Sequence, residues 1–128
     1  MDLRLRYSAD DSVELTGSPG VLRALANLLG RGESEVVAVP VPTTRPDPYD
    51  GWLESIAIHP EEEPLLLIRR ERRQLVLSGG RNSLAILADN VETLANSSND
   101  GEEHMHIEYF PGHYYLREGS VPLVLDVS

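Results

Sequence analysis

Two stretches of the chain share one pattern of apolar and polar positions. Val13–Leu29 and Leu75–Val91 each begin with alternating apolar residues, pass through a glycine-containing turn and continue with apolar residues at helical spacing. The stretches align without a gap, and the coinciding positions include Gly17 with Gly79, Leu22 with Leu84 and Leu25 with Leu87. Because a repeated pattern constrains architecture more than local propensity does, we expect two copies of one strand–turn–helix unit.

Alternating residues on either side of these units predict the remaining strands. In the first half, residues 2–16 are expected to form a hairpin, and a further strand is expected at Leu53–Ile58. Another is expected at Glu35–Val41, where Pro40 favours a position at an edge or an end. In the second half, Leu65–Ile68 is apolar on both faces, which is typical of a central strand. Residues 69–73 should form a turn, and strands should follow at 75–77, 104–110 and 121–127.

Capping residues predict where the helices begin and end. Ser18 can cap a helix, Pro19 suits the first helical position, and Gly30 is a C-terminal stop signal. The second helix should follow Gly79-Gly80, and it carries an unbroken apolar stripe made by Leu84, Leu87, Ala88, Val91, Leu94 and Ala95.

The order of these elements predicts an α+β fold. Each half, residues 1–60 and 64–128, contains two strands, a helix and two strands, so we expect one domain built from duplicated ββαββ units. A largely antiparallel sheet would carry both helices on one face, since each helix has one apolar stripe. Counted from the second strand, the order also resembles the duplicated βαβββ domain of DNA sliding clamps, a likeness of fold alone.

Composition narrows the class of protein. The chain has a net charge of −10 and contains no cysteine, so disulfides, thiolate catalysis and cysteine-based zinc sites are excluded. No apolar run is long enough to span a bilayer and no signal peptide is recognisable, so we expect a cytoplasmic protein. Strong acidity disfavours binding to nucleic-acid phosphates and favours attraction to a basic partner.

The sharpest candidate for a chemical site is the stretch His104–Glu108 with His113 just beyond it. Residues i and i+2 of a strand share a face, so His104, His106 and Glu108 would project together as metal ligands. The alternative is a polar, solvent-facing side of a strand whose Met105, Ile107 and Tyr109 point inward, and such motifs without context have many false positives.

Two other motifs have structural explanations. Arg69–Arg73 could bind an anion, or could be a solvated turn balanced by nearby Glu61–Glu63. Gly79-Gly80 before a helix could hold a phosphate, but no Lys-Ser/Thr and no third glycine follow, so a shared strand-to-helix turn is the simpler explanation.

No catalytic motif is present, and the remaining features suit a protein interface. Residues 40–52 contain four prolines and form a stiff loop that presents aromatic residues, while acidic runs could meet a basic partner. The predicted partner-binding residues are Tyr49, Trp52, Glu61, Glu62, Glu63, His113, Tyr114 and Tyr115. Further acids at Asp100, Glu102 and Glu103 are expected to be solvated.

The C-terminal part of the chain resembles a known family. His106–His113 (HIEYFPGH) and Ser120–Val124 (SVPLV) are similar to small α+β immunity proteins of bacterial, chiefly actinobacterial, polymorphic-toxin systems. Tyr114 departs from this pattern, because proline is expected there. The resemblance implies a protein without catalytic activity or cofactor that neutralises a toxin by binding it.

Three functions follow, in order of preference. The first is an immunity-type inhibitor that binds a basic toxin domain. The second is a metal-binding protein or metalloenzyme that uses His104, His106, Glu108 and His113. The third is a clamp-like protein associated with nucleic acid. An exposed sheet edge would also allow a homodimer.

Overall fold

A computed structural model describes residues 1–97 and 104–128, and in these residues it shows two helices and nine strands. Asp100, Glu102 and Glu103, which were expected to be solvated, lie outside the described residues. The elements are β1 (Arg4–Tyr7), β2 (Val13–Gly17), α1 (Pro19–Arg31), β3 (Glu35–Ala38), β4 (Gly51–Trp52), β5 (Ser55–Pro60), β6 (Leu67–Glu71), β7 (Gln74–Gly79), α2 (Arg81–Ser97), β8 (His104–Ile107) and β9 (Leu123–Val127). The predicted α+β class is confirmed.

The strands form two sheets, so the prediction of one sheet is wrong. Sheet A has the order β4-β1-β2-β9-β8 and sheet B the order β3-β5-β7-β6. Each sheet combines a hairpin from one half of the chain with strands from the other half, and the strands that join them, β2 with β9 and β5 with β7, run parallel. The other strand pairs are antiparallel, as expected. This order is compatible with a duplication, which stays a prediction of the sequence.

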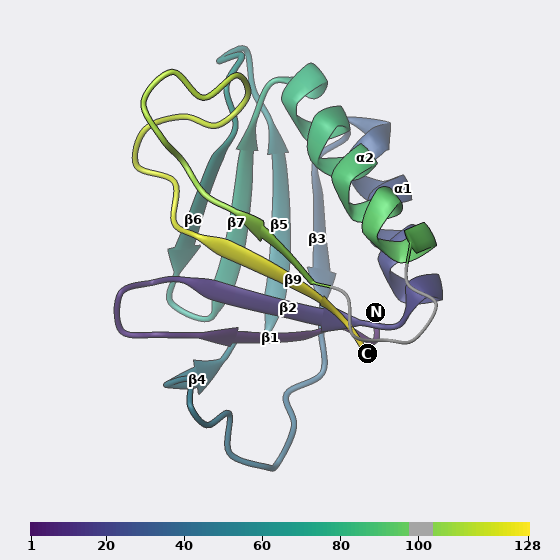
Figure 1. The fold of residues 1–128 in the computed structure, drawn as a ribbon, viewed down its shortest axis with the longest axis vertical. Helices are drawn as coiled ribbons and strands as arrows, with labels where there is room; N and C mark the ends of the chain where they lie inside the picture. Colours follow the sequence, from purple (N-terminus) through teal and green to yellow (C-terminus); the bar gives the residue numbers. More distant parts are fainter. Residues whose placement is uncertain (98–103) are drawn as a thin grey trace.

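Both helices pack against each other and lie on the same side of the molecule (Figure 1). The predicted start of α1 is confirmed, because Ser18 Oγ accepts a hydrogen bond from the Val21 amide at 3.3 Å and Pro19 is the first helical residue. The predicted stop at Gly30 is wrong. The helix continues to Arg31 and ends at Gly32, whose left-handed φ of 64° makes it the better C-cap. Neither helix is long and apolar enough to cross a membrane.

One core unites the helices and the inner faces of both sheets. The predicted apolar stripes are confirmed, since every predicted stripe residue of α2 is buried, as are Leu22, Leu25, Ala26 and Leu29 of α1. Leu3, just before β1, belongs to the same cluster, to which the strands contribute Leu5, Val13, Leu15, Ile56, Ile58, Ile68, Leu75, Leu77, Leu123, Leu125 and Val127. Side chains that alternate with these therefore lie on the outer faces of the sheets.

Strand β6 lies at the edge of sheet B, although its apolar sequence was typical of a central strand. The reason is that the C-terminal loop covers its outer edge. The Leu66 amide donates to Tyr115 O, the Arg117 amide donates to Leu66 O, and the Val121 amide donates to Ile68 O, each at 2.8 Å. Leu66 and Ile68 are consequently fully buried without a neighbouring strand on that side.

The glycines before α2 allow two chain segments to come close together. A Cβ on Gly79 would lie 2.6 Å from Leu65 O and 2.7 Å from Leu66 Cα, and a Cβ on Gly80 would lie 2.9 Å from Pro64 O. These obstacles are backbone atoms, which cannot move aside as a flexible side chain can. The pair lies where β7 turns into α2, and close packing of the segment before β6 explains why both residues are glycine.

We expect Gly79→Ala to lower the free energy of unfolding by about 1–3 kcal/mol, because its Cβ overlaps the backbone of Leu65 and Leu66. Gly20→Ala is the matched control, since nothing lies within 4 Å of a Cβ there and the position is helical. That control should keep or raise stability, by up to ~1 kcal/mol. Urea unfolding of both variants measures the difference, and equal stabilities would contradict the packing argument.

Candidate partner-binding face

The outer face of sheet A is largely polar. In the strand register, Arg6 lies between Trp52 and Glu14, and Thr16 pairs with Asp126, which in turn pairs with His104. We call this surface the sheet A face, and its members are Arg4, Arg6, Glu14, Thr16, Trp52, His104, His106, Val124 and Asp126. Their neighbours along the strands point into the core.

Arg6 attaches the proline-rich loop to this face. Its Nε donates to Glu14 Oε1 at 2.7 Å, its Nη2 donates to the same oxygen, and its Nη1 donates to the carbonyl oxygens of Pro46 at 3.1 Å and Asp47 at 3.0 Å. The guanidinium also lies over the ring of Tyr49, 4.3 Å from its centroid. A single charged side chain thus holds both the strand pair and the loop.

Two of the predicted partner-binding residues belong to this arrangement. Trp52 is half-buried, and its Nε1 donates to Thr44 O at 2.8 Å, which fixes the indole at the margin of the face. Tyr49 is also half-buried under Arg6, and burial together with the negative charge of Glu14 raises the pKa of its hydroxyl. Both aromatic side chains are therefore held in place before any partner arrives.

Asp126 and Glu14 form a pair of acids on the sheet A face. Partial burial, a hydrogen bond with Glu14 and the negative charge of Glu14 raise the pKa of Asp126 to about 6, while His104 and Arg6 act in the opposite direction. Carboxylates this close disfavour ionisation of both at once. Above that pKa both carboxylates are negatively charged, and the hydrogen bonds of Arg6 go to Glu14.

The predicted metal site does not come together. His104 and His106 lie side by side on β8 with ring centroids 5.3 Å apart, but both are exposed, and Glu108 lies past the end of the strand. Within residues 1–97 and 104–128, no three His, Asp or Glu side chains are grouped so that they could hold a metal ion. The alternative explanation, a polar strand face opposite buried Ile107 and half-buried Met105, describes the arrangement better.

His113 has a different role from the one predicted. Its Nδ1 accepts hydrogen bonds from the amides of Tyr115 at 3.2 Å and Leu116 at 3.0 Å, so it stabilises the turn that leads into the cover of β6. Burial lowers the pKa of this imidazole, which favours the neutral form that can accept these bonds. It is thus part of the loop architecture rather than a ligand beside His104.

The other predicted partner-binding residues lie elsewhere. Glu61–Glu63 are exposed and follow β5, where Glu61 Oε2 is 3.7 Å from Arg117 Nη2, and Tyr114 is 71% exposed in the loop between β8 and β9. Tyr115 is only 3% exposed, and its hydroxyl oxygen accepts a hydrogen bond from Asn90 Nδ2, so it belongs to the core. Figure 1 shows this loop at the opposite end of the molecule from β4.

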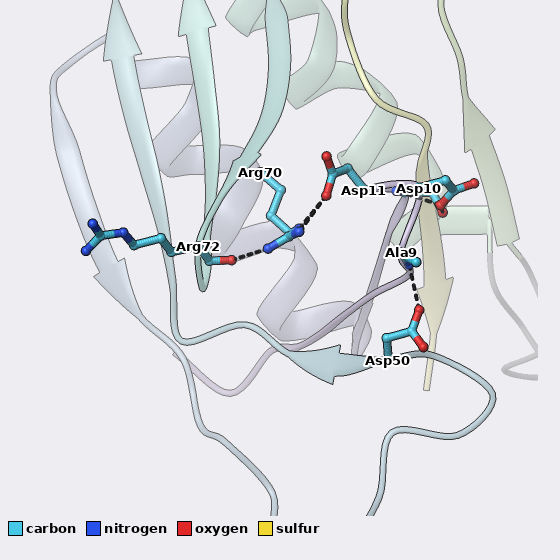
Figure 2. Close-up of polar contacts among 7 residues, drawn as sticks. Ala9, Asp10, Asp11, Asp50, Arg70 and Arg72 are labelled. Atoms are coloured by element: carbon cyan, nitrogen blue, oxygen red, sulfur yellow. Dashed lines mark hydrogen bonds and ion pairs between the residues drawn. The ribbon is translucent and has the colours of Figure 1, made fainter.

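The arginine cluster is also not a single turn. Arg69 and Arg70 lie within β6, and only Arg72 and Arg73 form the turn. Arg70 Nε and Nη2 donate to Asp11 Oδ1 at 2.9 and 2.6 Å, and its Nη1 donates to the carbonyl oxygen of Arg72 (Figure 2). Arg69 and Arg73 pair with Glu71 and Glu54. The expected balance of charge is present, but the balancing acids are Asp11, Glu54 and Glu71 rather than Glu61–Glu63. The expected solvation is wrong for Arg69 and Arg70, which are half-buried in β6.

Sequence reasoning missed Arg6, Glu14 and Asp126. Alternation marks each of them as an outward-facing residue, because Leu5, Leu15 and Leu125 beside them are apolar. Nothing in the alternation indicates that β2 takes β9 as its neighbour, however, and the acid pair exists only through that pairing.

We expect the raised pKa of Asp126 to appear in the pH dependence of stability. Between pH 3.8, the ordinary pKa of an aspartate, and about pH 6, Asp126 keeps its proton in the folded protein but loses it in the unfolded chain. The contribution of Asp126 to the free energy of unfolding therefore falls as pH rises through that window. Asp126→Asn removes the effect, and its stability relative to wild type should rise by on the order of 1 kcal/mol from pH 4 to pH 7, after allowance for solvent screening. Urea unfolding across this range measures it.

Glu62→Gln is the control, because it makes the same chemical change at an exposed position far from the sheet A face. If both variants show the same pH dependence relative to wild type, the coupling between Asp126 and Glu14 is wrong.

Comparison with known families agrees with the resemblance seen in the sequence. Residues 74–127, a little under half of the chain, match the sequence model of the family described as Immunity protein 32. The match begins at β7 and includes α2, β8 and β9, so it contains His104, His106 and Asp126 of the sheet A face. No curated protein and no solved structure shows significant similarity to the chain. The C-terminal part of this protein is therefore similar to an immunity-protein family.

Proposed function

We propose that this protein is an immunity-type inhibitor that binds a toxin partner through the sheet A face and performs no catalysis. The observation that carries the proposal is the family match over residues 74–127, which contains the β8 and β9 side of that face. The proposal also accounts for the first half of the chain, because β1, β2 and β4 complete the same surface.

The charges of the sheet A face suit a basic partner. Arg6 donates hydrogen bonds to Glu14, so a lysine or arginine from the partner would pair with Asp126. The net charge of −10 would steer such a partner toward the protein over longer distances and would repel nucleic-acid phosphates.

The arrangement of the aromatic residues also supports binding. Tyr49 and Trp52 are held by Arg6 and by Thr44 O, so an encounter requires little further loss of side-chain freedom. Fixed aromatic side chains beside complementary charge are common interface anchors. The absence of cysteine fits a cytoplasmic encounter that needs no disulfide.

The shape of the face favours a macromolecule over a small substrate. The hollow that includes Arg4 and Thr16 has a volume of only about 190 Å³. Small-molecule sites usually measure ~300–1,000 Å³. An exposed sheet surface with a small hollow at its end is therefore a poor enzyme site and a suitable docking surface.

The test is capture of a partner from lysate of the source organism, with this chain as bait at low and moderate salt. We expect one stoichiometric, basic protein whose expression stops bacterial growth and whose effect is relieved by co-expression of this chain. A folded bait that captures nothing, or a captured protein whose toxicity it does not relieve, would contradict the immunity function.

Two matched double variants then locate the binding surface. Glu14→Gln with Asp126→Asn should weaken binding by about tenfold or more, equal to ~1.4 kcal/mol, because the partner's cation loses its carboxylates. Glu62→Gln with Glu63→Gln removes the same charge at the other end of the molecule, and we expect less than about a threefold effect there. Isothermal titration calorimetry with the purified partner measures both, and a larger effect at Glu62 and Glu63 would move the interface to that end.

A further inference from the structure

Strand β3 leaves one edge of sheet B open. Among the strands that the structure describes it pairs only with β5, and the hydrogen bond from the Val39 amide to Glu54 O, at 2.9 Å, fixes which of its residues face that strand. In an antiparallel pair these residues alternate, so the backbone groups of Val36 and Ala38 point away from β5. Ala38 O accepts a hydrogen bond from Met1 N at 3.2 Å, which agrees with this orientation. Within residues 1–97 and 104–128, no hydrogen bond occupies the amide or the carbonyl of Val36, so both can pair with an added strand.

A groove follows this open edge. It has a volume of about 670 Å³ and lies between β3 and α1, with Val21, Ala24 and Leu28 on the helix side. Val36 on the strand side is 64% exposed, a high value for a valine in a sheet. In Figure 1, β3 is the strand of sheet B nearest to the helices.

The groove matches the geometry of one more strand. Side chains of an added strand would alternate between the two faces of sheet B. Those on the inner face would cover Val21, Ala24 and Leu28, and those on the outer face would lie beside Val36. Gly20 adds space at the end of the groove, because nothing lies within 4 Å of where its Cβ would be.

Charge indicates the kind of strand that would bind. The groove is lined by the acidic side chains of Asp2 and Glu35, and no arginine is among its lining residues. A segment with basic residues between apolar ones would be attracted to it. A second copy of this chain would instead bring the same acids together, and each copy carries a net charge of −10.

We propose that the edge of β3 and its groove bind an extended segment of a partner protein, in which apolar and basic residues alternate, as an added strand of sheet B. This mode of recognition takes affinity from main-chain hydrogen bonds and specificity from alternate side chains. The surface is separate from the sheet A face, and its binding does not depend on the immunity function.

The test uses a fluorescent, capped decapeptide of alternating valine and arginine, titrated against the full chain by fluorescence polarisation. We expect saturable binding that weakens about tenfold or more when the peptide backbone is N-methylated at alternate residues, because those amides can no longer pair. A peptide of alternating valine and glutamate should bind at least about tenfold more weakly.

Variants of the protein separate backbone pairing from other contacts. Val36→Pro removes the outward amide without breaking a bond to β5, a position at which edge strands tolerate proline, and it should abolish binding. Val36→Thr keeps the amide and should bind within about threefold of wild type. The double variant Glu14→Gln with Asp126→Asn should also bind within about threefold, which keeps this test independent of the sheet A face.

Hydrogen exchange of the Val36 amide tests backbone pairing in the wild-type protein, so this test holds even if Val36→Pro does not fold. The amide should exchange rapidly in the free protein and become protected when the valine–arginine peptide saturates it. Absence of binding up to millimolar peptide, equal binding by a folded Val36→Pro variant, or an amide that stays unprotected would overturn the proposal. Protection that rises with protein concentration alone would assign the edge to a second copy and would overturn it too.

Discussion

The structure depends on an exchange of strands between the two halves of the chain. The hairpin β1–β2 is completed by β9 and β8, and the hairpin β6–β7 is completed by β5 and β3. Parallel neighbours cannot be joined by a tight turn. The chain between β2 and β9 accordingly includes both helices, and the chain between β5 and β7 includes β6 with its flanking loops. Neither half can finish its own sheet, and residues from both halves form one core.

The sheet A face is a direct consequence of that exchange. Glu14 belongs to the first half and Asp126 to the second, and they meet because β2 and β9 are neighbours. Arg6 binds Glu14 and then holds the proline-rich loop, so Tyr49 and Trp52 lie beside the acid pair. The family match contains only the β8 and β9 side of this surface, while β1, β2 and β4 supply the rest.

Features that depend on near neighbours in sequence were predicted well. Alternation found the hairpin of β1 and β2, helical spacing found the buried stripes, and Ser18-Pro19 marked the start of α1. Features that depend on residues far apart in the sequence were predicted poorly. Leu66 and Ile68 are buried by the loop at 115–121 rather than by a strand, and Tyr115 is held in the core by Asn90. An aromatic residue in a polar loop gives no sign of which way it points.

The sequence by itself determined the α+β class, the positions of most strands and the inward faces of both helices, because period and capping are local properties of a chain. Only the tertiary structure decided the number of sheets, the partners of each strand and therefore the composition of the outer faces. Alternation states that Arg6, Glu14 and Asp126 face outward, but strand pairing decides that they face outward together. Strand pairing depends on how two hairpins and two helices can pack around one core, and no single segment of the sequence determines it.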